Sequence, residues 1–337
     1  MPDSVHPPTA RPRAVAIWLF AVAALVFLMT VIGGVTRLTE SGLSIVDWRP
    51  VTGALPPLTE DAWQAELDKY RQSPQYRLVN RGMTLADFKA IYWWEYIHRL
   101  WGRLIGVAFA LPFLWFLWRR RIPPGYTPRL LVAFALGGLQ GLVGWLMVAS
   151  GLVDRPSVSQ YRLVAHLGLA LAIYAYLLWL AFDLCRGDRP SPPGTAGRRL
   201  APALAALAFA TILSGGFVAG LDAGMVYNTF PLMDGRLVPE VYGQMSPWWA
   251  NLFENAAAVQ FNHRLLATAT LAAVVAGAVV MRRAPPPASR LAVAAAAVAC
   301  VQVSLGIATL LTQVPVSLGA LHQAGAVTLL TVLVWLT

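Results

Sequence analysis

The sequence predicts an all-α integral membrane protein in which eight transmembrane helices form two four-helix bundles. Three observations lead to this prediction. The 337 residues are 57% hydrophobic and only 12% charged, whereas a soluble domain carries about 25% charged residues. Eight apolar segments are long enough to span a bilayer, which takes about 20 residues. The second half of the chain also repeats the first half, segment by segment.

The eight apolar segments define the predicted organisation of the chain. They span residues 14–36, 85–118, 128–150, 161–184, 199–221, 256–281, 289–312 and 317–337. The first segment lacks a small-residue cleavage site, so we interpret it as a retained helix rather than a signal peptide. The predicted parts are therefore a tail (1–13), an N-terminal half (14–184), a linker (185–198) and a C-terminal half (199–337).

Arginines are concentrated on one side of the predicted membrane. Three proline-rich connections and the tail hold thirteen arginines, whereas two connections on the other side hold three. The basic connections are 119–129, 185–199 and 282–290, and the others are 151–162 and 222–255. Positive charge marks the cytoplasmic side, so we expect a multi-pass protein of the cell inner (plasma) membrane with both termini cytoplasmic. The same pattern accounts for the net charge of +10 without nucleic acid as a partner.

The first outer loop, residues 37–88, is the longest predicted connection and has mixed charge. It contains a short amphipathic segment, "LTEDAWQAELDKYRQSP". Thr59 is placed to cap a helix there, and Trp63, Leu67 and Tyr70 fall on one helical face. We expect this helix to pack over the outer mouth of the bundle.

The two halves align at four motifs. The aligned pairs are "GGVTRLTESGL" (33–43) with "GGFVAGLDAGM" (215–225), "YIHRLWGRLIG" (96–106) with "FNHRLLATATL" (261–271), "LQGLVGW" (139–145) with "VQVSLGI" (301–307), and "VAHLGLALA" (164–172) with "ALHQAGAVT" (320–328). Each half contains an even number of spans, so both halves cross the membrane in the same direction. Parallel repeats of this kind are related by a pseudo-two-fold axis along the membrane normal.

Four of the five histidines begin the apolar stretches of alternate predicted spans: His98, His166, His263 and His322. The fifth, His6, lies in the polar tail. At 1.5 Å per residue, the first three lie about 27 to 30 Å from the inner ends of their helices, and His322 lies at least about 22 Å out. Because the hydrocarbon core is about 30 Å thick, we expect all four near the outer face.

This arrangement of histidines favours haem binding. Any one of them could instead hydrogen-bond a neighbouring helix, but ionisable groups within a membrane are costly and usually functional. Two histidines per half, at matched depth on alternate helices, suit a planar iron porphyrin bound from both faces. A small residue, which leaves space for a flat ring but is also common in membrane helices, stands one turn below each: Gly102, Ala170, Ala267 and Ala326.

Other metal sites and disulfides have less support in the sequence. Zinc is a weaker alternative to haem, because neither half offers a third convincing protein ligand. The two cysteines, Cys185 and Cys300, lie within or at the end of apolar segments. They indicate neither a disulfide framework nor a cysteine-based metal site.

An acidic residue distinguishes the two halves. Glu95 stands three residues before His98, where the other half has Gln260. Residues three apart on a helix share a face, so this carboxylate could hold or move protons beside a haem. The alternative is an interfacial glutamate that bonds a loop or pairs with Arg99. If the difference is functional, the first half performs chemistry and the second half holds an electron-transfer haem.

Further polar residues occupy equivalent places in the two halves. Arg99 and Arg264 each follow a histidine and could pair with haem propionates or extend toward lipid headgroups. Glu40 and Asp222 each stand two residues before a glycine, at the outer ends of the first and fifth spans. For these two acids we expect a role in turns or helix ends.

The motifs together resemble the haem A synthase family. In order, they are "GGVTRLTESGLSI", "EYIHRLWGR", "AHLG", "FNHRLLA" and "LHQ". The resemblance covers nearly the whole chain, and the combination is specific although no single motif is. It implies oxidation of the C8 methyl group of haem O to a formyl group, which gives haem A for cytochrome oxidase.

The resemblance also implies roles for individual residues. His263 and His322 would ligate haem b in the C-terminal half, His98 and His166 would flank the substrate haem O, and Glu95 would be an essential acid. Two histidine ligands fill both axial positions of an iron. Either His98 or His166 must therefore release during turnover, or the oxidation proceeds without oxygen bound at iron.

Partners follow from the resemblance as well. Haem O synthase and cytochrome oxidase assembly factors are implied, together with an electron donor of unknown identity. Some members of the family carry a cysteine pair in an outer loop, whereas this chain resembles the cysteine-free subgroup. Electron delivery through thiols is therefore not expected.

Two other functions fit parts of the sequence. A cytochrome b-type electron carrier with bis-histidine haems would explain the four histidines but would leave Glu95 unexplained. A transporter with parallel repeats would favour broken helices and polar groups at the membrane midplane, whereas the polar groups here are predicted near the outer face. Haem content separates these possibilities.

Overall fold

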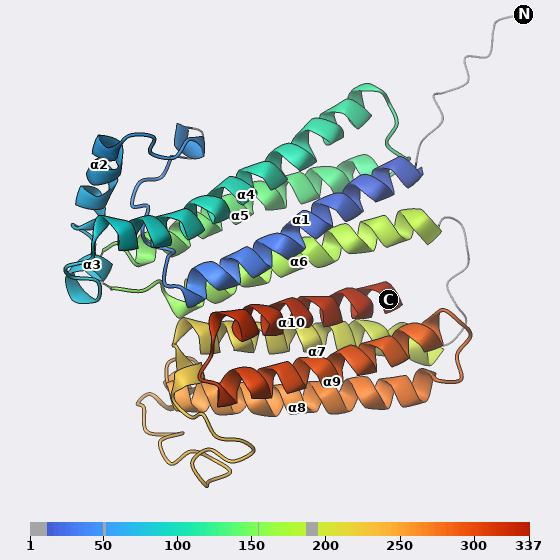
Figure 1. The fold of residues 1–337 in the computed structure, drawn as a ribbon. Coiled ribbons are helices and arrows are strands. Elements are labelled where there is room, and N and C mark those ends of the chain that lie inside the picture. Colours follow the sequence, from blue (N-terminus) through green and yellow to red (C-terminus); the bar gives the residue numbers. More distant parts are fainter. Residues whose placement is uncertain (1–11, 50–51, 154, 187–194) are drawn as a thin grey trace, which may run out of the picture.

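The computed structural model describes residues 12–49, 52–153, 155–186 and 195–337. Within them the regular secondary structure is helical, apart from one isolated bridge between Met233 and Arg236, and loops connect the helices (Figure 1). The long helices are α1 (Pro12–Leu38), α4 (Leu85–Trp118), α5 (Tyr126–Ser150), α6 (Gln160–Arg186), α7 (Thr195–Gly220), α8 (Ala256–Met281), α9 (Ala288–Leu311) and α10 (Val316–Leu336). The short ones are α2 (Glu60–Tyr70), α3 (Pro74–Leu78), η1 (Thr52–Ala54), η2 (Ala223–Met225) and η3 (Trp248–Leu252).

The structure confirms the predicted all-α membrane architecture. Eight helices in the described part of the chain are long and apolar enough to cross a membrane. Two of them, α4 and α8, have the bounds that the sequence predicts, and the other six differ by a few residues at their ends. Residues 1–11 of the predicted tail and 187–194 of the predicted linker lie outside the described residues.

Local sequence explains where several helices begin. Thr84 caps α4 in a reciprocal arrangement with Asp87, which satisfies two main-chain donors. Asn255 caps α8 by accepting from the main-chain N–H groups of Ala257 and Ala258. Prolines precede α9 and α10, where a preceding helix could not continue without losing a hydrogen bond.

Each half forms a closed four-helix bundle. In the N-terminal half, α1 contacts α4 and α6, and α5 contacts the same two helices. In the C-terminal half, α7 contacts α8 and α10, and α9 contacts the same two helices. The two bundles lie side by side with their long axes roughly aligned (Figure 1). This arrangement is consistent with the predicted repeat, since equivalent helices make equivalent contacts.

The two bundles meet along four helices. The contacts are α1 with α10, α6 with α7, and α6 with α10. The Gln323 side chain of α10 donates a 2.8 Å hydrogen bond to the Thr30 carbonyl of α1 and lies directly against Gly34. A side chain at position 34 would displace this glutamine, so the glycine allows the two helices to approach each other.

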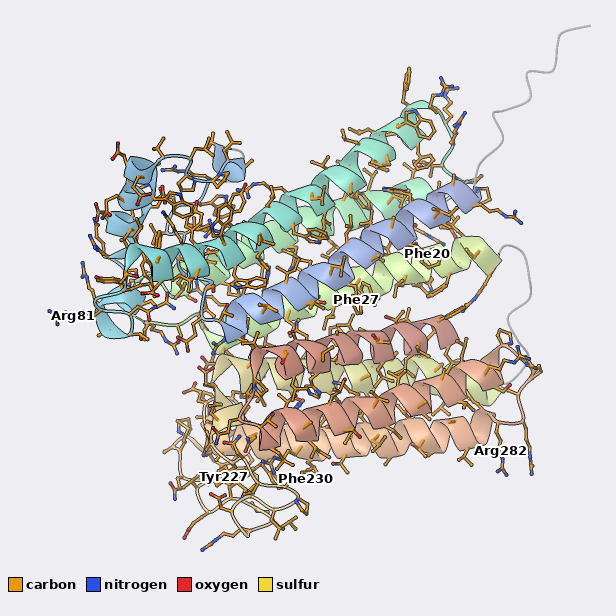
Figure 2. The ribbon with its side chains drawn as sticks, in the orientation of Figure 1. Phe20, Phe27, Arg81, Tyr227, Phe230 and Arg282 are labelled. Carbon is orange, nitrogen blue, oxygen red and sulfur yellow. The ribbon has the colours of Figure 1, made fainter. Side chains whose placement is uncertain are left out.

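Apolar packing is concentrated at one end of both bundles. The largest buried cluster joins α1, α4, α5 and α6 with residues of α10, and it includes Phe113, Leu130, Leu177 and Leu330. A second cluster joins α7, α8, α9 and α10. In Figure 2, Arg282 marks the end of the molecule near the second cluster, and Tyr227 and Phe230 lie at the opposite end. That opposite end is the one at which the sequence predicts the histidines.

The predicted amphipathic helix in the first outer loop is confirmed as α2. Thr59 caps it by accepting from the Ala62 N–H at 3.3 Å. Its buried face, formed by Trp63, Leu67 and Tyr70, packs on the first turns of α4. Burial of these aromatic and aliphatic groups fixes the loop against the N-terminal end of α4.

Candidate functional site

The four histidines all lie against a glycine of the preceding helix in their half. A Cβ atom added to Gly144 or Gly306 would stand 2.7 Å from the ring of His166 or His322. The same atom added to Gly33 or Gly215 would stand 3.2 or 3.1 Å from His98 or His263. These separations are at or below the limit of van der Waals contact, so a larger residue would displace each ring. A contact between a histidine and a glycine therefore occurs four times, twice in each half.

The two histidines of the C-terminal half face each other. Their ring centres lie 6.5 Å apart, and the ring planes are nearly perpendicular, at 88°. A bond between a metal and a histidine nitrogen is about 2 Å long. Because a ring centre lies about 1 Å beyond its nitrogen, two rings that hold one metal from opposite sides have centres about 6 Å apart. The spacing of His263 and His322 matches this requirement.

Two equivalent glutamines hold the fourth-helix histidine of each half. Gln140 donates to the His166 carbonyl at 3.0 Å and lies 3.1 Å from its Nδ1. Gln302 donates to the His322 carbonyl at 2.8 Å and lies 3.0 Å from its Nδ1. The Oε1 atom of both glutamines is buried without a protein partner. Each amide therefore fixes a histidine and keeps one acceptor free.

The second-helix histidines differ in their partners. Ser214 Oγ lies 2.8 Å from His263 Nδ1 and donates to the Thr211 carbonyl at 2.7 Å. His98 has no equivalent hydrogen bond to any residue that the structure describes. The first half therefore supports its two histidines unequally.

Side chains around the histidines are less deeply buried than those of the two apolar clusters. No residue is fully buried in six described stretches that include or flank the four histidines: 97–108, 134–150, 161–170, 261–269, 300–308 and 316–326. The apolar clusters of the two bundles lie outside these stretches for most of their residues. The predicted small residues Gly102, Ala170, Ala267 and Ala326 belong to these stretches.

The described residues contain no cluster of three or more His, Cys, Asp or Glu side chains that could hold a metal ion. The four histidines therefore form pairs rather than a classical protein metal cage. A flat group that brings its own equatorial ligands fits the spacing of the His263 and His322 rings. Haem is such a group.

Glu95 is buried, with 2% of its surface exposed, and both carboxylate oxygens have partners. Oε2 accepts from Ser44 Oγ at 2.7 Å and from the Ile45 N–H at 2.8 Å. Oε1 accepts from Arg99 at 2.6 and 3.0 Å. The interfacial alternative for this residue is therefore present in the structure, since Glu95 ties the loop after α1 to α4 and pairs with Arg99 of the same helix.

Arg99 and Arg264 make matching contacts in the two halves. Arg99 donates to the carbonyls of Ile45 at 2.6 Å and Asp47 at 2.9 Å. Arg264 donates to the carbonyls of Tyr227 and Thr229, each at 2.9 Å. The four carbonyls occupy equivalent positions, so each arginine fastens the segment that follows the first helix of its half. The Arg264 Nε atom is buried and has no protein partner.

The turns after α1 and α7 are also confirmed. Glu40 and Asp222 both adopt a left-handed conformation, with φ of 53° and 51°, which is typical of the residue that ends a helix. Asp222 has a second contact that sequence analysis did not find. Its two oxygens accept hydrogen bonds from Arg37 of α1 at 2.8 Å, which links the outer ends of the two bundles.

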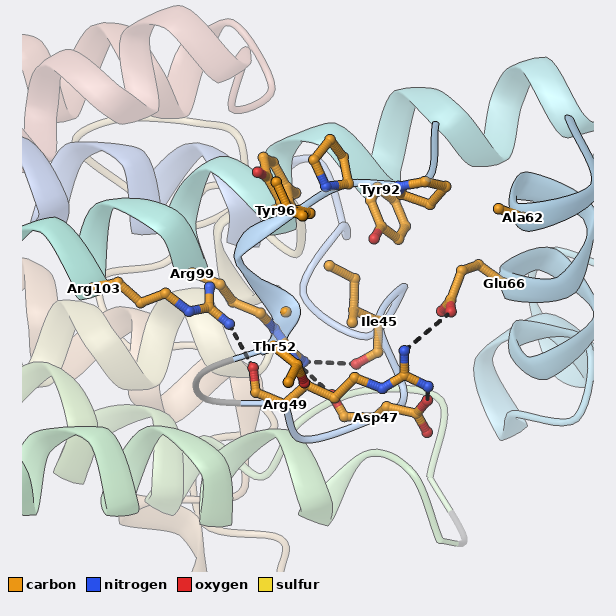
Figure 3. A pocket seen from close by; sticks show the side chains of 14 residues that line it. Ile45, Asp47, Arg49, Thr52, Ala62, Glu66, Tyr92, Tyr96, Arg99 and Arg103 are labelled. Atoms are coloured by element: carbon orange, nitrogen blue, oxygen red, sulfur yellow. Dashed lines mark hydrogen bonds and ion pairs between the residues drawn. The ribbon is translucent and has the colours of Figure 1, made fainter. Parts of the chain in front are cut away.

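A cavity of about 220 Å³ lies between the first outer loop and α4. Arg99 and Arg103 line it from α4, opposite Glu66 of α2 (Figure 3). Arg49 also lines the cavity, and its guanidinium group lies between two carboxylates, with Nη1 4.0 Å from Glu66 and Nη2 2.7 Å from Asp47. Most charges here are paired with one another, and no histidine lines the cavity. The cavity is therefore separate from the four histidines, although Arg99, which lines it, follows His98 in the chain.

Comparisons with known proteins identify the family. A family model described as "Cytochrome oxidase assembly protein" matches residues 16–334. A "Heme A synthase" of Parvibaculum lavamentivorans is 52% identical over 335 residues, which cover 99% of this chain and 96% of that protein. One of Rhodospirillum centenum is 53% identical over 330 residues, which cover 97% and 88%. The chain belongs to the haem A synthase family.

Membership of the haem A synthase family confirms the resemblance seen in the sequence. The alignment of the two halves also matched Gln140 with Gln302 and Gly144 with Gly306, but it did not show what these residues contact. Ser214 was missed altogether, because nothing in the first half corresponds to its hydroxyl group. Only the packing of α7 on α8 identifies it as a partner of His263.

Proposed function

We propose that the protein is a membrane oxidoreductase that converts haem O to haem A by oxidising the C8 methyl group to a formyl group. Two observations support this proposal. Relatives that are about half identical over nearly the whole chain are named "Heme A synthase". The spacing of the His263 and His322 rings suits a single iron held from both sides, which is the observation that carries the cofactor assignment.

In this proposal the C-terminal half binds a resident haem b. His263 and His322 are its axial ligands, and Ser214 and Gln302 hold these two rings in place. Arg264 keeps a buried donor, Nε, that no protein atom accepts, and this donor is suited to a haem propionate. Haem b bound here would relay electrons one at a time.

The N-terminal half binds the substrate haem O between His98 and His166. Their partners on the neighbouring helices, Gly33 and Gly144, match those of the C-terminal pair. Arg99 lies next to His98 and fastens the loop through Ile45 and Asp47. It therefore shapes the outer edge of the substrate site and presents positive charge to the propionates.

Glu95 is the proposed acid of the substrate site. Because its Oε2 accepts from the Ser44 hydroxyl, the two groups form a short path along which a proton can move between the carboxylate and the outer loop. Arg99 compensates the carboxylate charge at Oε1. Gln260 at the equivalent position instead donates to the Tyr227 carbonyl and cannot hold a proton in this way. Proton handling is thus confined to the N-terminal half.

The overall reaction balances with dioxygen as oxidant and an external electron donor. Each of two hydroxylations of the methyl group consumes one O₂, two electrons and two protons and releases one water. Loss of a third water from the resulting diol leaves the formyl group. The reaction thus needs four electrons, and haem b in the C-terminal half would relay them to the substrate site.

We also propose the orientation that the arginine distribution predicts. The protein lies in the cell inner membrane with its termini in the cytoplasm and its histidines near the outer face. The basic connections 119–129 and 282–290 lie at the end opposite the histidines, as the positive-inside pattern requires. Haem O synthase and cytochrome oxidase assembly factors are the proposed partners for delivery and use of the haems.

The first experiment is extraction and identification of the haems from purified protein. We expect one equivalent of haem b per chain together with haem O, haem A or a hydroxylated intermediate, each identified by mass. Two equivalents of haem b and no other haem would support an electron carrier without bond-making chemistry. Protein without haem would contradict both assignments.

A further inference from the structure

The helix that faces the second-helix histidine differs in chemistry between the two halves. Gly33 of α1 aligns with Gly215 of α7, and both lie against a histidine. One position earlier, α7 has Ser214 whereas α1 has Ile32. The halves thus share the glycine contact but differ in whether a hydroxyl group accompanies it.

The hydrogen bonds of Ser214 fit one protonation form of His263. A serine hydroxyl has one hydrogen to donate, and the Thr211 carbonyl, which can only accept, lies 2.7 Å from Ser214 Oγ. When the hydroxyl donates to this carbonyl, the 2.8 Å contact between Ser214 Oγ and His263 Nδ1 is donated by the histidine. With the proton on Nδ1, the lone pair of Nε2 is available to a metal. Ser214 therefore holds His263 in the form and orientation of a ligand.

No such support exists for His98. Ile32 has no polar atom, and His98 lacks a hydrogen-bond partner among the described residues, whereas His166 and His322 are held by glutamines and His263 by Ser214. The two rings are also turned differently. The atom of His98 nearest to the Cβ position of Gly33 is Nε2, whereas the atom of His263 nearest to that of Gly215 is Cε1.

We propose that residue 214 and its counterpart, residue 32, decide whether a histidine is a permanent or a releasable haem ligand. Ser214 is a positioning residue that keeps His263 on the iron of haem b. Ile32 leaves His98 unsupported, so His98, rather than His166, is the ligand that leaves the substrate iron and opens a coordination position. This inference rests on the proposed function, because it assigns a haem to each half.

The test measures how fast each haem leaves the full-length protein in detergent. Purified protein is mixed with excess apomyoglobin, and the transferred haem is identified by mass at successive times. Outer partners of metal-bound histidines typically contribute 10- to 100-fold to metal affinity. We therefore expect Ser214→Ala to accelerate transfer of haem b by about 10- to 100-fold, and Ser214→Thr, which retains the hydroxyl group, to restore slow transfer.

The reciprocal variant is Ile32→Ser, with Ile32→Val as its matched control. A hydroxyl group at position 32 should support His98 and slow the transfer of haem O by about tenfold, whereas valine should not. The ferric electron paramagnetic resonance spectrum provides a second readout. Ser214→Ala should add a high-spin signal from haem b with one ligand lost, and Ile32→Ser should reduce any such signal from haem O.

The outcomes separate this inference from the proposed function. Haem b transfer that stays within twofold of the wild type in Ser214→Ala, with an unchanged spectrum, overturns the role of Ser214. If that variant fails to fold, Ile32→Ser decides, and unchanged haem O transfer overturns the role of position 32. Protein that never contains haem O or haem A, yet loses haem b faster in Ser214→Ala, contradicts the proposed function and supports the ligand role of Ser214.

Discussion

The N-terminal and C-terminal bundles share a framework and differ in the groups that touch the histidines. Both place a histidine on a glycine twice, and both use an arginine to fasten the segment after their first helix. They differ at two equivalent positions. The N-terminal half has Glu95 and Ile32, and the C-terminal half has Gln260 and Ser214 at the corresponding places. The shared contacts hold the four histidines, and in the proposed function the two differences assign one half to chemistry and the other to electron transfer.

The largest expected effect is the loss of haem b when a histidine of the C-terminal half is replaced, but not when one of the N-terminal half is replaced. His263→Ala should remove haem b and stop electron supply, because an axial ligand is lost. His98→Ala should leave haem b at one equivalent per chain, because that residue belongs to the other bundle. Haem extraction with mass identification checks both variants. Retention of haem b in His263→Ala would refute the assignment of this ligand.

Glu95→Gln makes the first half resemble the second at its acidic position. We expect turnover of haem O to fall by about 100-fold, in line with the usual contribution of a general acid or base. Haem b should remain bound in the C-terminal bundle, because Glu95 and its partners, the loop after α1 and Arg99, all belong to the N-terminal bundle. Product formation is measured by mass on haem extracted at timed intervals. Intact turnover in Glu95→Ala with haem b in place would contradict the proposed role of Glu95 as the acid of the substrate site.

A methyl group on the supporting glycines should weaken each haem site in turn. Gly306→Ala places its Cβ 2.7 Å from the His322 ring, so the ring must move, and we expect about tenfold weaker retention of haem b. Gly144→Ala should do the same for haem O. Gly141→Ala on the same helix is the matched control, because nothing lies within 4 Å of its added atom. Equal behaviour of Gly141→Ala and Gly144→Ala would contradict the ring contact.

The smallest expected effect concerns the ion pair between the bundles. Asp222→Asn weakens its contact with Arg37, but 62% of the Asp222 side chain is exposed. Exposed ion pairs contribute about 0 to 1 kcal/mol, so we expect the unfolding temperature in detergent to fall by no more than about 4 °C. The difference should shrink at high salt because exposed charges are screened. A salt-independent loss would mean that the contact is not electrostatic.

Helix positions could be predicted from the sequence because apolar length and proline-rich connections set them directly. The bounds of α4 and α8 follow from the ends of their apolar runs, and the cap at Thr59 follows from the acids after it. The four histidines could be found because polar residues stand out in apolar segments. All four candidate histidine ligands could therefore be identified from the sequence without knowledge of the fold.

Contacts between helices could not be predicted in the same way. A glycine in an apolar run has no side chain to reveal its neighbour, so the contact of Gly306 with His322 depends on how α9 packs on α10. Ser214 is one small polar residue among many in membrane helices, and its partner is 49 positions away. The duplication allowed equivalent residues to be paired and identified Glu95 against Gln260, but it did not identify Ser214 against Ile32 as a difference beside a histidine.

The interface between the two bundles has a consequence for the origin of the molecule. Under the pairing of the repeats, the contact of α1 with α10 becomes that of α7 with α6, and the contact of α6 with α10 becomes itself. An interface that maps onto itself is the kind that two identical subunits form. The chain thus has the arrangement that a fused homodimer of four-helix subunits would have. Two halves in one chain can carry different residues at equivalent positions, such as Ser214 and Ile32 or Glu95 and Gln260, which identical subunits cannot do.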